Sequence, residues 1–178
     1  MQLKEAVLDR WSPKSFVLNQ VDETLIVQIF ETVRWAHSAF NEQPWRFMIA
    51  TPDDGLIRNQ LEQLLNPGNA YAKQAWVLGL VAARRQRLKD GLENRHCLFD
   101  TGAACQLLSL KAFELGLGTR FMAGFNLEGA RKLVPDDLEP IALFVIGHRG
   151  SEGVTAPAGR MRKPVAEFLF RGHWPERS

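Results

Sequence analysis

The sequence predicts an α+β fold in which helices surround a central sheet. Two continuous apolar runs, at 76–83 and 141–146, have the composition of strands that are buried on both faces. Apolar residues at helical spacing over 25–33 indicate an amphipathic helix that packs beside them. Because helices and strands do not alternate strictly along the chain, the sequence favours a sandwich of helices around the sheet over a repeated βαβ arrangement.

The N-terminal half is predicted to hold three helices and one strand. Leu3, Val7 and Arg10 recur at helical spacing, and Pro13 ends that helix because proline disfavours helix in the residue before it. Asp22 can cap the helix that carries the apolar stripe. The other expected elements are a strand at Trp45–Ala50 between Pro44 and Pro52, a helix at Asp53–Leu65 and a loop at Asn66–Asn69.

The C-terminal half is predicted to contain the core helix and the buried strands. The segment Asp100–Leu115 is apolar over much of its circumference, which is typical of a helix in the core or in a subunit interface. Gly116 and Gly118 end it. Further elements are expected at Thr119–Ala123 (strand), Glu128–Val134 (helix), Ile141–Ile146 (strand) and Val165–Phe170 (strand).

Composition narrows the class of protein. The 178 residues fit one domain, 1–178, and a net charge of +2 with a pI near 8.7 allows a local cationic pocket for a phosphorylated small molecule. The basic run 84–89 lacks interleaved aromatic residues and adjoins acidic ones, so nucleic-acid binding is not expected. Cys97 and Cys105 fit neither a disulfide framework nor a zinc motif, and no metal site is expected. Without a readable signal peptide or membrane span, we expect a cytoplasmic protein.

Four segments, in this order, resemble the nitroreductase family. Arg10–Phe16 is similar to its opening motif, and Ser38–Trp45 is similar to its Pro-Ser-x-x-Asn-x-Gln-Pro-Trp loop. The segment from Asp100 through Gly-Leu-Gly at 116–118 to Gly124-Phe125 resembles the central helix and the strand that follows it. Ile146–His148 and Arg160–Arg162 resemble the closing strand and a late basic pair.

The resemblance implies an FMN-dependent homodimer with a mainly antiparallel sheet and a C-terminal segment exchanged between subunits. It implies ping-pong electron transfer from NADH or NADPH to a small-molecule acceptor such as a nitroaromatic, quinone or enone, without a dedicated catalytic side chain. The loop around Ser38 and Asn41 would reach the flavin of the partner subunit. The implied cofactor-binding residues are Arg10, Trp11, Ser12, Lys14, Ser38, Asn41, Ala123, Gly124, Arg160 and Arg162. Four of them are cations that would converge on the phosphate, which suits guanidinium forks in particular.

Two departures from the family pattern leave alternatives open. His37 stands where proline is usual, and Phe121-Met122-Ala123-Gly124 replaces the Pro-x-Glu-Gly of the better-known branch, so a glutamate side chain is absent. The alternatives are another branch of the superfamily, for reductive dehalogenation or flavin cleavage, and a non-catalytic flavin-binding domain. The physiological substrate, the preference between NADH and NADPH, and whether Asn66 or Asn69 approaches the flavin are also open.

Overall fold

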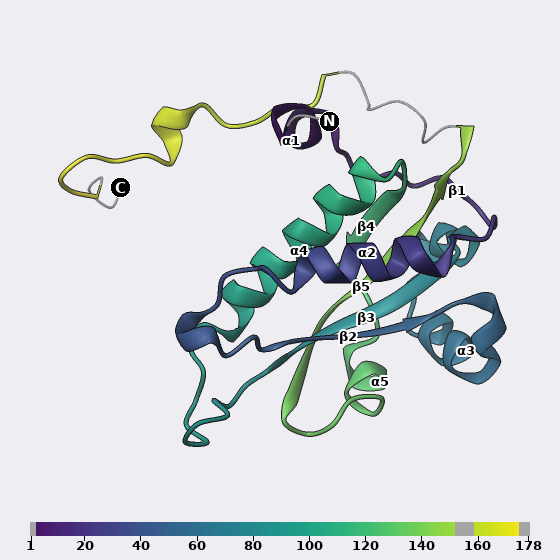
Figure 1. Ribbon diagram of the computed structural model, residues 1–178, viewed down its shortest axis with the longest axis horizontal. Coiled ribbons are helices and arrows are strands. Elements are labelled where there is room, and N and C mark those ends of the chain that lie inside the picture. The colour runs from purple at the N-terminus through teal and green to yellow at the C-terminus, as the bar shows by residue number, and fades with distance from the viewer. Residues whose placement is uncertain (1–2, 152–158, 175–178) are drawn as a thin grey trace.

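Five antiparallel strands form the sheet at the centre of the molecule. The computed structural model describes residues 3–151 and 159–174 (Figure 1). The strand order is β1-β5-β3-β2, and β4 pairs with β5 on the side away from β3. The strands are β1 (Phe16–Val17), β2 (Trp45–Ala50), β3 (Val77–Arg84), β4 (Gly118–Met122) and β5 (Leu138–Arg149). The predicted α+β class and the antiparallel sheet are confirmed.

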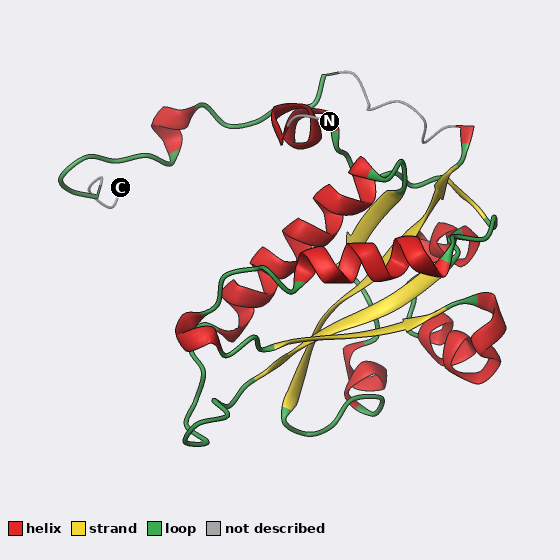
Figure 2. Cartoon of the chain, in the orientation of Figure 1, coloured by secondary structure: helices red, strands yellow, loops and turns green. Residues whose placement is uncertain are grey.

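Strand β3 is buried on both faces, as its apolar composition predicted. Val77 and Val81 face one core cluster, whereas Leu78 and Leu80 face a second cluster on the other side of the sheet. Side chains alternate between the faces of a strand, so one continuous apolar run supplies both clusters. Helices α2 and α4 cover the first cluster, and α3 and α5 cover the second (Figure 2).

The helices follow the expected pattern with shifted ends. The Asp22 carboxylate accepts a hydrogen bond from the Thr24 N–H at 2.8 Å and so caps α2, while Ile26 and Ile29 are buried. The central helix begins at Cys97, three residues before the predicted start. The helices are α1 (Leu3–Asp9), α2 (Glu23–Val33), α3 (Gly55–Gln63), α4 (Cys97–Glu114) and α5 (Leu127–Arg131).

Two local features differ from those that the sequence predicted. The 3-10 helix Pro67–Gln74 takes up residues 67–69 of the expected loop at 66–69. Strand β1 has two residues and no sequence period, and it exists because it pairs with His148 and Arg149. That pairing also extends β5 beyond the predicted 141–146.

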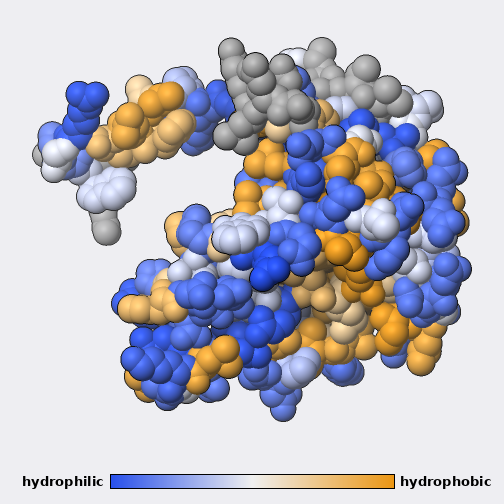
Figure 3. Space-filling view, in the orientation of Figure 1, coloured by the Kyte–Doolittle hydropathy of each residue, from blue (hydrophilic) through white to orange (hydrophobic). Residues whose placement is uncertain are grey.

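The C-terminal segment 159–174 leaves the body of the molecule as an extended arm (Figure 1). The predicted strand at 165–170 is wrong for this single chain, because Val165–Glu167 forms a 3-10 helix and the following residues pair with no strand. The arm exposes apolar side chains over much of its length (Figure 3): Met161, Val165, Phe168, Leu169, Phe170 and Trp174. Among the described residues, no helix is long and apolar enough to cross a membrane.

Candidate functional site

A cluster of arginines lies where the root of the arm meets the end of α1. The Arg160 Nη1 donates to the Arg10 carbonyl oxygen at 2.7 Å, and its Nη2 donates to the carbonyl oxygen of Leu8. The Arg10 Nη1 lies 3.4 Å from the Ser12 hydroxyl oxygen. The fold therefore brings Arg10, Ser12 and Arg160 together across about 150 residues of sequence, as the resemblance implied.

This arginine cluster, defined by Arg10, Arg160 and Arg162, brings like charges close together. Among the side chains that the structure describes, those of residues 6–151 and 159–174, none of the three forms an ion pair with a carboxylate. Burial lowers the pKa of the Arg10 guanidinium, and repulsion from the Arg160 and Arg162 charges lowers it further. Such a group of like charges is stabilised by an anion.

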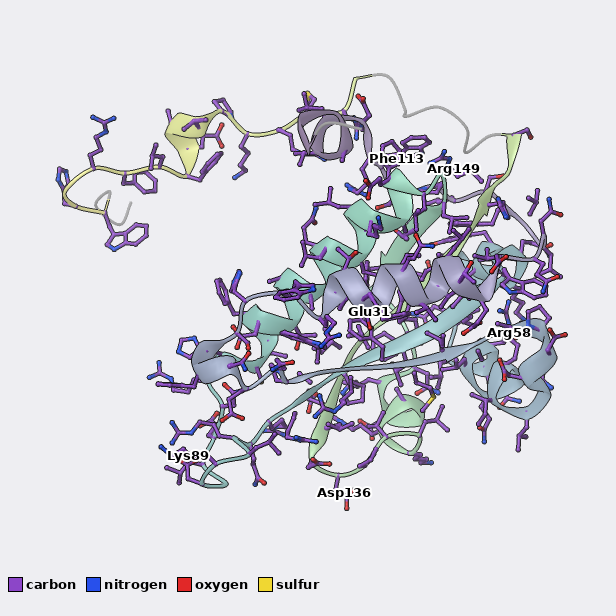
Figure 4. The ribbon with its side chains drawn as sticks, in the orientation of Figure 1. Glu31, Arg58, Lys89, Phe113, Asp136 and Arg149 are labelled. Carbon is purple, nitrogen blue, oxygen red and sulfur yellow. The ribbon has the colours of Figure 1, made fainter. Side chains whose placement is uncertain are left out.

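The other two predicted cofactor-binding residues of the opening motif, Trp11 and Lys14, have different surroundings. Trp11 packs edge-on against Phe113 at 5.9 Å between ring centroids, and the Arg149 guanidinium lies 5.0 Å from the Trp11 ring centroid. Phe113 and Arg149 lie side by side near the end of α4 (Figure 4). Trp11 therefore anchors the motif to the core helix. Lys14 is exposed, with no hydrogen bond or ion pair to another described residue.

The turn after β4 is held from the side of α3. The Asn69 Nδ2 donates to the Gly124 carbonyl oxygen at 2.8 Å, and the Tyr71 hydroxyl donates to the Asn69 Oδ1 at 3.1 Å. A Cβ on Gly124 would lie 3.3 Å from the Asn66 Nδ2, so glycine permits this close approach. Asn69 thus holds the turn, while the Asn66 side chain lies beside it. Ala123 and Gly124 are exposed at this turn.

The loop at 38–43 has a backbone that few residues adopt. Phe40, Asn41 and Gln43 have φ of 55°, 58° and 45°, and each such residue costs about 1–3 kcal/mol unless its surroundings impose it. The Ser38 Oγ accepts from the Gln43 N–H at 3.1 Å, and the Gln43 Nε2 donates to the Asn41 Oδ1 at 3.0 Å. Ser38 and Asn41 therefore brace the loop internally in the single chain.

Two charged residues support these regions without having been predicted to do so. The buried Asp100 carboxylate accepts from the Ala39 N–H at 3.0 Å and ties the loop to α4. The Arg120 Nη1 donates to the Ser12 carbonyl oxygen at 2.7 Å. A carboxylate in a largely apolar helix is a usable sequence signal for Asp100. Arg120 gives none, because its partners are remote in sequence.

The arginine cluster and the loop at 38–43 lie at opposite ends of α4, whereas Ala123 and Gly124 lie in the separate turn after β4. Ala39 contacts Asp100 in the first turn, whereas Trp11 contacts Phe113 near the last turn. Thirteen residues of helix separate these two contacts, or about 20 Å at 1.5 Å per residue. A compact ligand at the arginine cluster would thus not reach the loop of the same chain.

The fold and these two groups define an α+β protein with a cationic end suited to a phosphorylated ligand and a braced polar loop at the far end. The nitroreductase family model matches residues 7–93. A candidate NADH dehydrogenase/NAD(P)H nitroreductase of Methanothermobacter thermautotrophicus is 28% identical over 157 residues, covering 83% of this chain and 78% of that protein. An uncharacterized 15.4 kDa protein of Mycolicibacterium smegmatis, from the ask 5′ region, is 34% identical over 122 residues, covering 64% of this chain and 82% of that protein.

Solved structures share this fold. The crystal structure of an oxidoreductase containing FMN superposes with a TM-score of 0.88 at 28% identity, covering 99% of this chain and 95% of that one. The chain belongs to the nitroreductase family. The predicted resemblance is confirmed.

Proposed function

We propose that this protein is an FMN-dependent oxidoreductase that takes electrons from NADH or NADPH and passes them to a small-molecule acceptor. The observation that carries the proposal is the arginine cluster beside Ser12, which has no carboxylate partner among the described residues. The FMN-containing oxidoreductase and the NAD(P)H nitroreductase described above support the choice of cofactor and electron donor.

The cluster fits the phosphate of FMN in charge and in chemistry. A phosphate monoester carries nearly two negative charges near neutral pH, and guanidinium groups bind such oxygens in paired hydrogen bonds. Arg10, Arg162 and the Ser12 hydroxyl would hold the phosphate, and Lys14 would add a charge from the same loop. Arg160 has a second role, because two of its donors cap the carbonyl end of α1.

The rest of the site would orient the flavin ring. When bound, FMN supplies the redox chemistry by accepting a hydride and passing electrons on. The exposed backbone of Ala123 and Gly124, fixed by Asn69, would border the ring. Because Ala123 replaces a glutamate, this turn offers no carboxylate, and nitroaromatic, quinone or enone acceptors would be held by shape and backbone polarity.

A second copy of the chain would complete the site. The loop bearing Ser38 and Asn41 lies about 20 Å along α4 from the cluster, so the loop of a partner would have to cover each flavin. The apolar arm supports the same assembly, because side chains such as Phe168 and Trp174 are exposed in a single chain (Figure 3). Obligate interfaces of this kind commonly bury more than about 2,000 Å². We therefore propose a homodimer in which the arms are exchanged.

The principal test is titration of apoprotein with FMN and with riboflavin. Arg10→Ala and Arg162→Ala each remove charge-assisted hydrogen bonds that contribute about 1.5–3 kcal/mol, so FMN should bind about ten- to a hundredfold more weakly. Riboflavin, which lacks the phosphate, should change little. The control is Arg85→Ala, because Arg85 is exposed and pairs with Glu139 at 3.5 Å away from the cluster. Equal weakening of FMN and riboflavin would contradict the phosphate assignment.

The packing of Phe121 favours a catalytic protein over a flavin-binding domain with a blocked face. Its ring stacks on Phe144 at 5.5 Å between centroids and packs against the core, so it is not turned outward over the turn at Ala123. Stopped-flow mixing with NADH or NADPH separates the two functions. Rapid bleaching of bound flavin, followed by reoxidation with a quinone, is expected of the enzyme, whereas a flavin that stays oxidised would indicate the binding domain.

A further inference from the structure

Arg120 lies between the opening motif and the turn at Gly124. It lies on the edge strand β4, on the same face as Gly118 and Met122, because side chains alternate along a strand. Its Nη1 donates to the Ser12 carbonyl oxygen at 2.7 Å, and its guanidinium carbon lies 5.7 Å from the Tyr71 ring centroid. Ser12 belongs to the opening motif, and Tyr71 leads through Asn69 to the Gly124 turn. Arg120 therefore touches both sides of the proposed flavin site.

The guanidinium of Arg120 has fewer partners than its surroundings require. Its Nε is buried without a hydrogen-bond partner, and no carboxylate among the described residues pairs with it. The Ser12 carbonyl and the Tyr71 ring are its neutral neighbours. A partly desolvated cation with neutral partners is unfavourable unless an anion compensates its charge.

Arg58 shows what a fully satisfied guanidinium looks like in the same protein. Its Nε donates to the Glu62 carboxylate at 2.8 Å, and its two terminal nitrogens donate to four backbone carbonyl oxygens. Arg58 is a structural residue, because a carboxylate compensates its charge and backbone carbonyl oxygens accept its remaining hydrogen bonds. Arg120 has no carboxylate partner among the described residues and leaves its Nε unpaired, and Ser12, its carbonyl partner, also lies beside Arg10.

We propose that Arg120 is a further flavin-binding residue, which recognises the anionic phosphate end of FMN and holds the Ser12 backbone in place for it. This inference rests on the proposed function. It assigns an anchor on the sheet side of the site, in addition to Arg10, which follows α1, and the arginines of the arm. The fixed strand position of Arg120 distinguishes it from Arg162, which is exposed on the arm. The cationic end thus combines one anchor on the sheet with Arg10 and the arginines of the arm.

The test compares Arg120→Gln and Arg120→Lys with the wild-type apoprotein. FMN and riboflavin affinities are measured by quenching of flavin fluorescence, and thermal unfolding of each apoprotein is followed by circular dichroism. Arg120→Gln should weaken FMN binding about ten- to a hundredfold, with a much smaller effect on riboflavin. Arg120→Lys should recover part of the loss, because it restores the charge without the fork.

The matched control is Arg84→Gln. Arg84 also lies on a strand with a partly buried side chain, but it pairs with Asp137 at 3.3 Å, so its charge is met by the protein. FMN affinity should be unchanged in this variant. The inference is overturned if Arg120→Gln binds FMN as tightly as wild type, or if it weakens FMN and riboflavin equally while lowering the unfolding temperature. A wild-type protein that fails to bind FMN would instead refute the proposed function, and this inference with it.

Discussion

Replacing Asp100 by alanine should destabilise the protein through the loop at 38–43. The Asp100 side chain is buried in the first turn of α4 and accepts the Ala39 N–H at 3.0 Å. It holds one end of a loop in which three residues have positive φ. Without this anchor, the Ala39 N–H loses its partner and the strained loop is free to relax to a more ordinary backbone.

The size of the effect follows from two contributions. A hydrogen bond to a charged group contributes about 1.5–3 kcal/mol, and a negative charge in the first turn of a helix contributes about 0.3–1 kcal/mol. The free energy of unfolding should therefore fall by about 2–4 kcal/mol. For a chain of this size each kcal/mol shifts the melting temperature by about 2–4 °C, so we expect a decrease of about 4–16 °C.

Differential scanning calorimetry of the apoprotein measures this decrease. Asp137→Ala is the control, because Asp137 is half-exposed and its ion pair with Arg84 should contribute less than about 1 kcal/mol. Asp100→Asn should lie between the two, since an amide oxygen can still accept from Ala39 but carries no charge. A melting temperature for Asp100→Ala within about 1 °C of wild type would show that the carboxylate does not hold the loop.

Three further predictions concern the core, the thiol on α4 and the arm. Arg58→Met should lower the free energy of unfolding by about 3–5 kcal/mol in urea titrations, because Glu62 and four carbonyl oxygens lose their donors; a loss below about 1 kcal/mol would contradict this. Burial raises the pKa of Cys105 from 9.0 to about 12. Because the folded pKa is the higher one, the contribution of the protonated thiol to the free energy of unfolding is present below pH 9. It is lost as the pH rises towards 12, by up to about 1.4 kcal/mol per pH unit. The free energy of unfolding of Cys105→Ala should fall less steeply than that of wild type between pH 9 and 10.5, and equally steep falls would contradict this role of the thiol. Removal of 165–178 should weaken dimer and FMN binding together, and sedimentation showing a dimer with full flavin occupancy would refute the role of the arm.

The sequence by itself determined the elements whose signals are local. The apolar stripe and the Asp22 cap define α2, and the apolar run at 76–83 identifies β3 as a strand buried on both faces. Such elements are predictable because neighbouring residues create the periodicity and supply the capping bonds. The motif at 10–16 and the late basic pair also predicted one cationic site, because their resemblance to the family implies that these two distant segments meet.

Only the tertiary structure decided which distant residues meet. Strand β1 is two residues long and depends on pairing with His148 and Arg149, which no local pattern announces. Arg120 and Ser12 are 108 positions apart, and Asp100 and Ala39 are 61 apart. These contacts depend on how strands and helices cross.

In the arm, by contrast, the local sequence predicts a strand that the single chain does not form. Its composition is that of a strand, but among the described residues it pairs with no strand, forms one 3-10 turn and exposes its apolar side chains. A strand needs a partner for its hydrogen bonds, and that partner is not encoded in the segment itself.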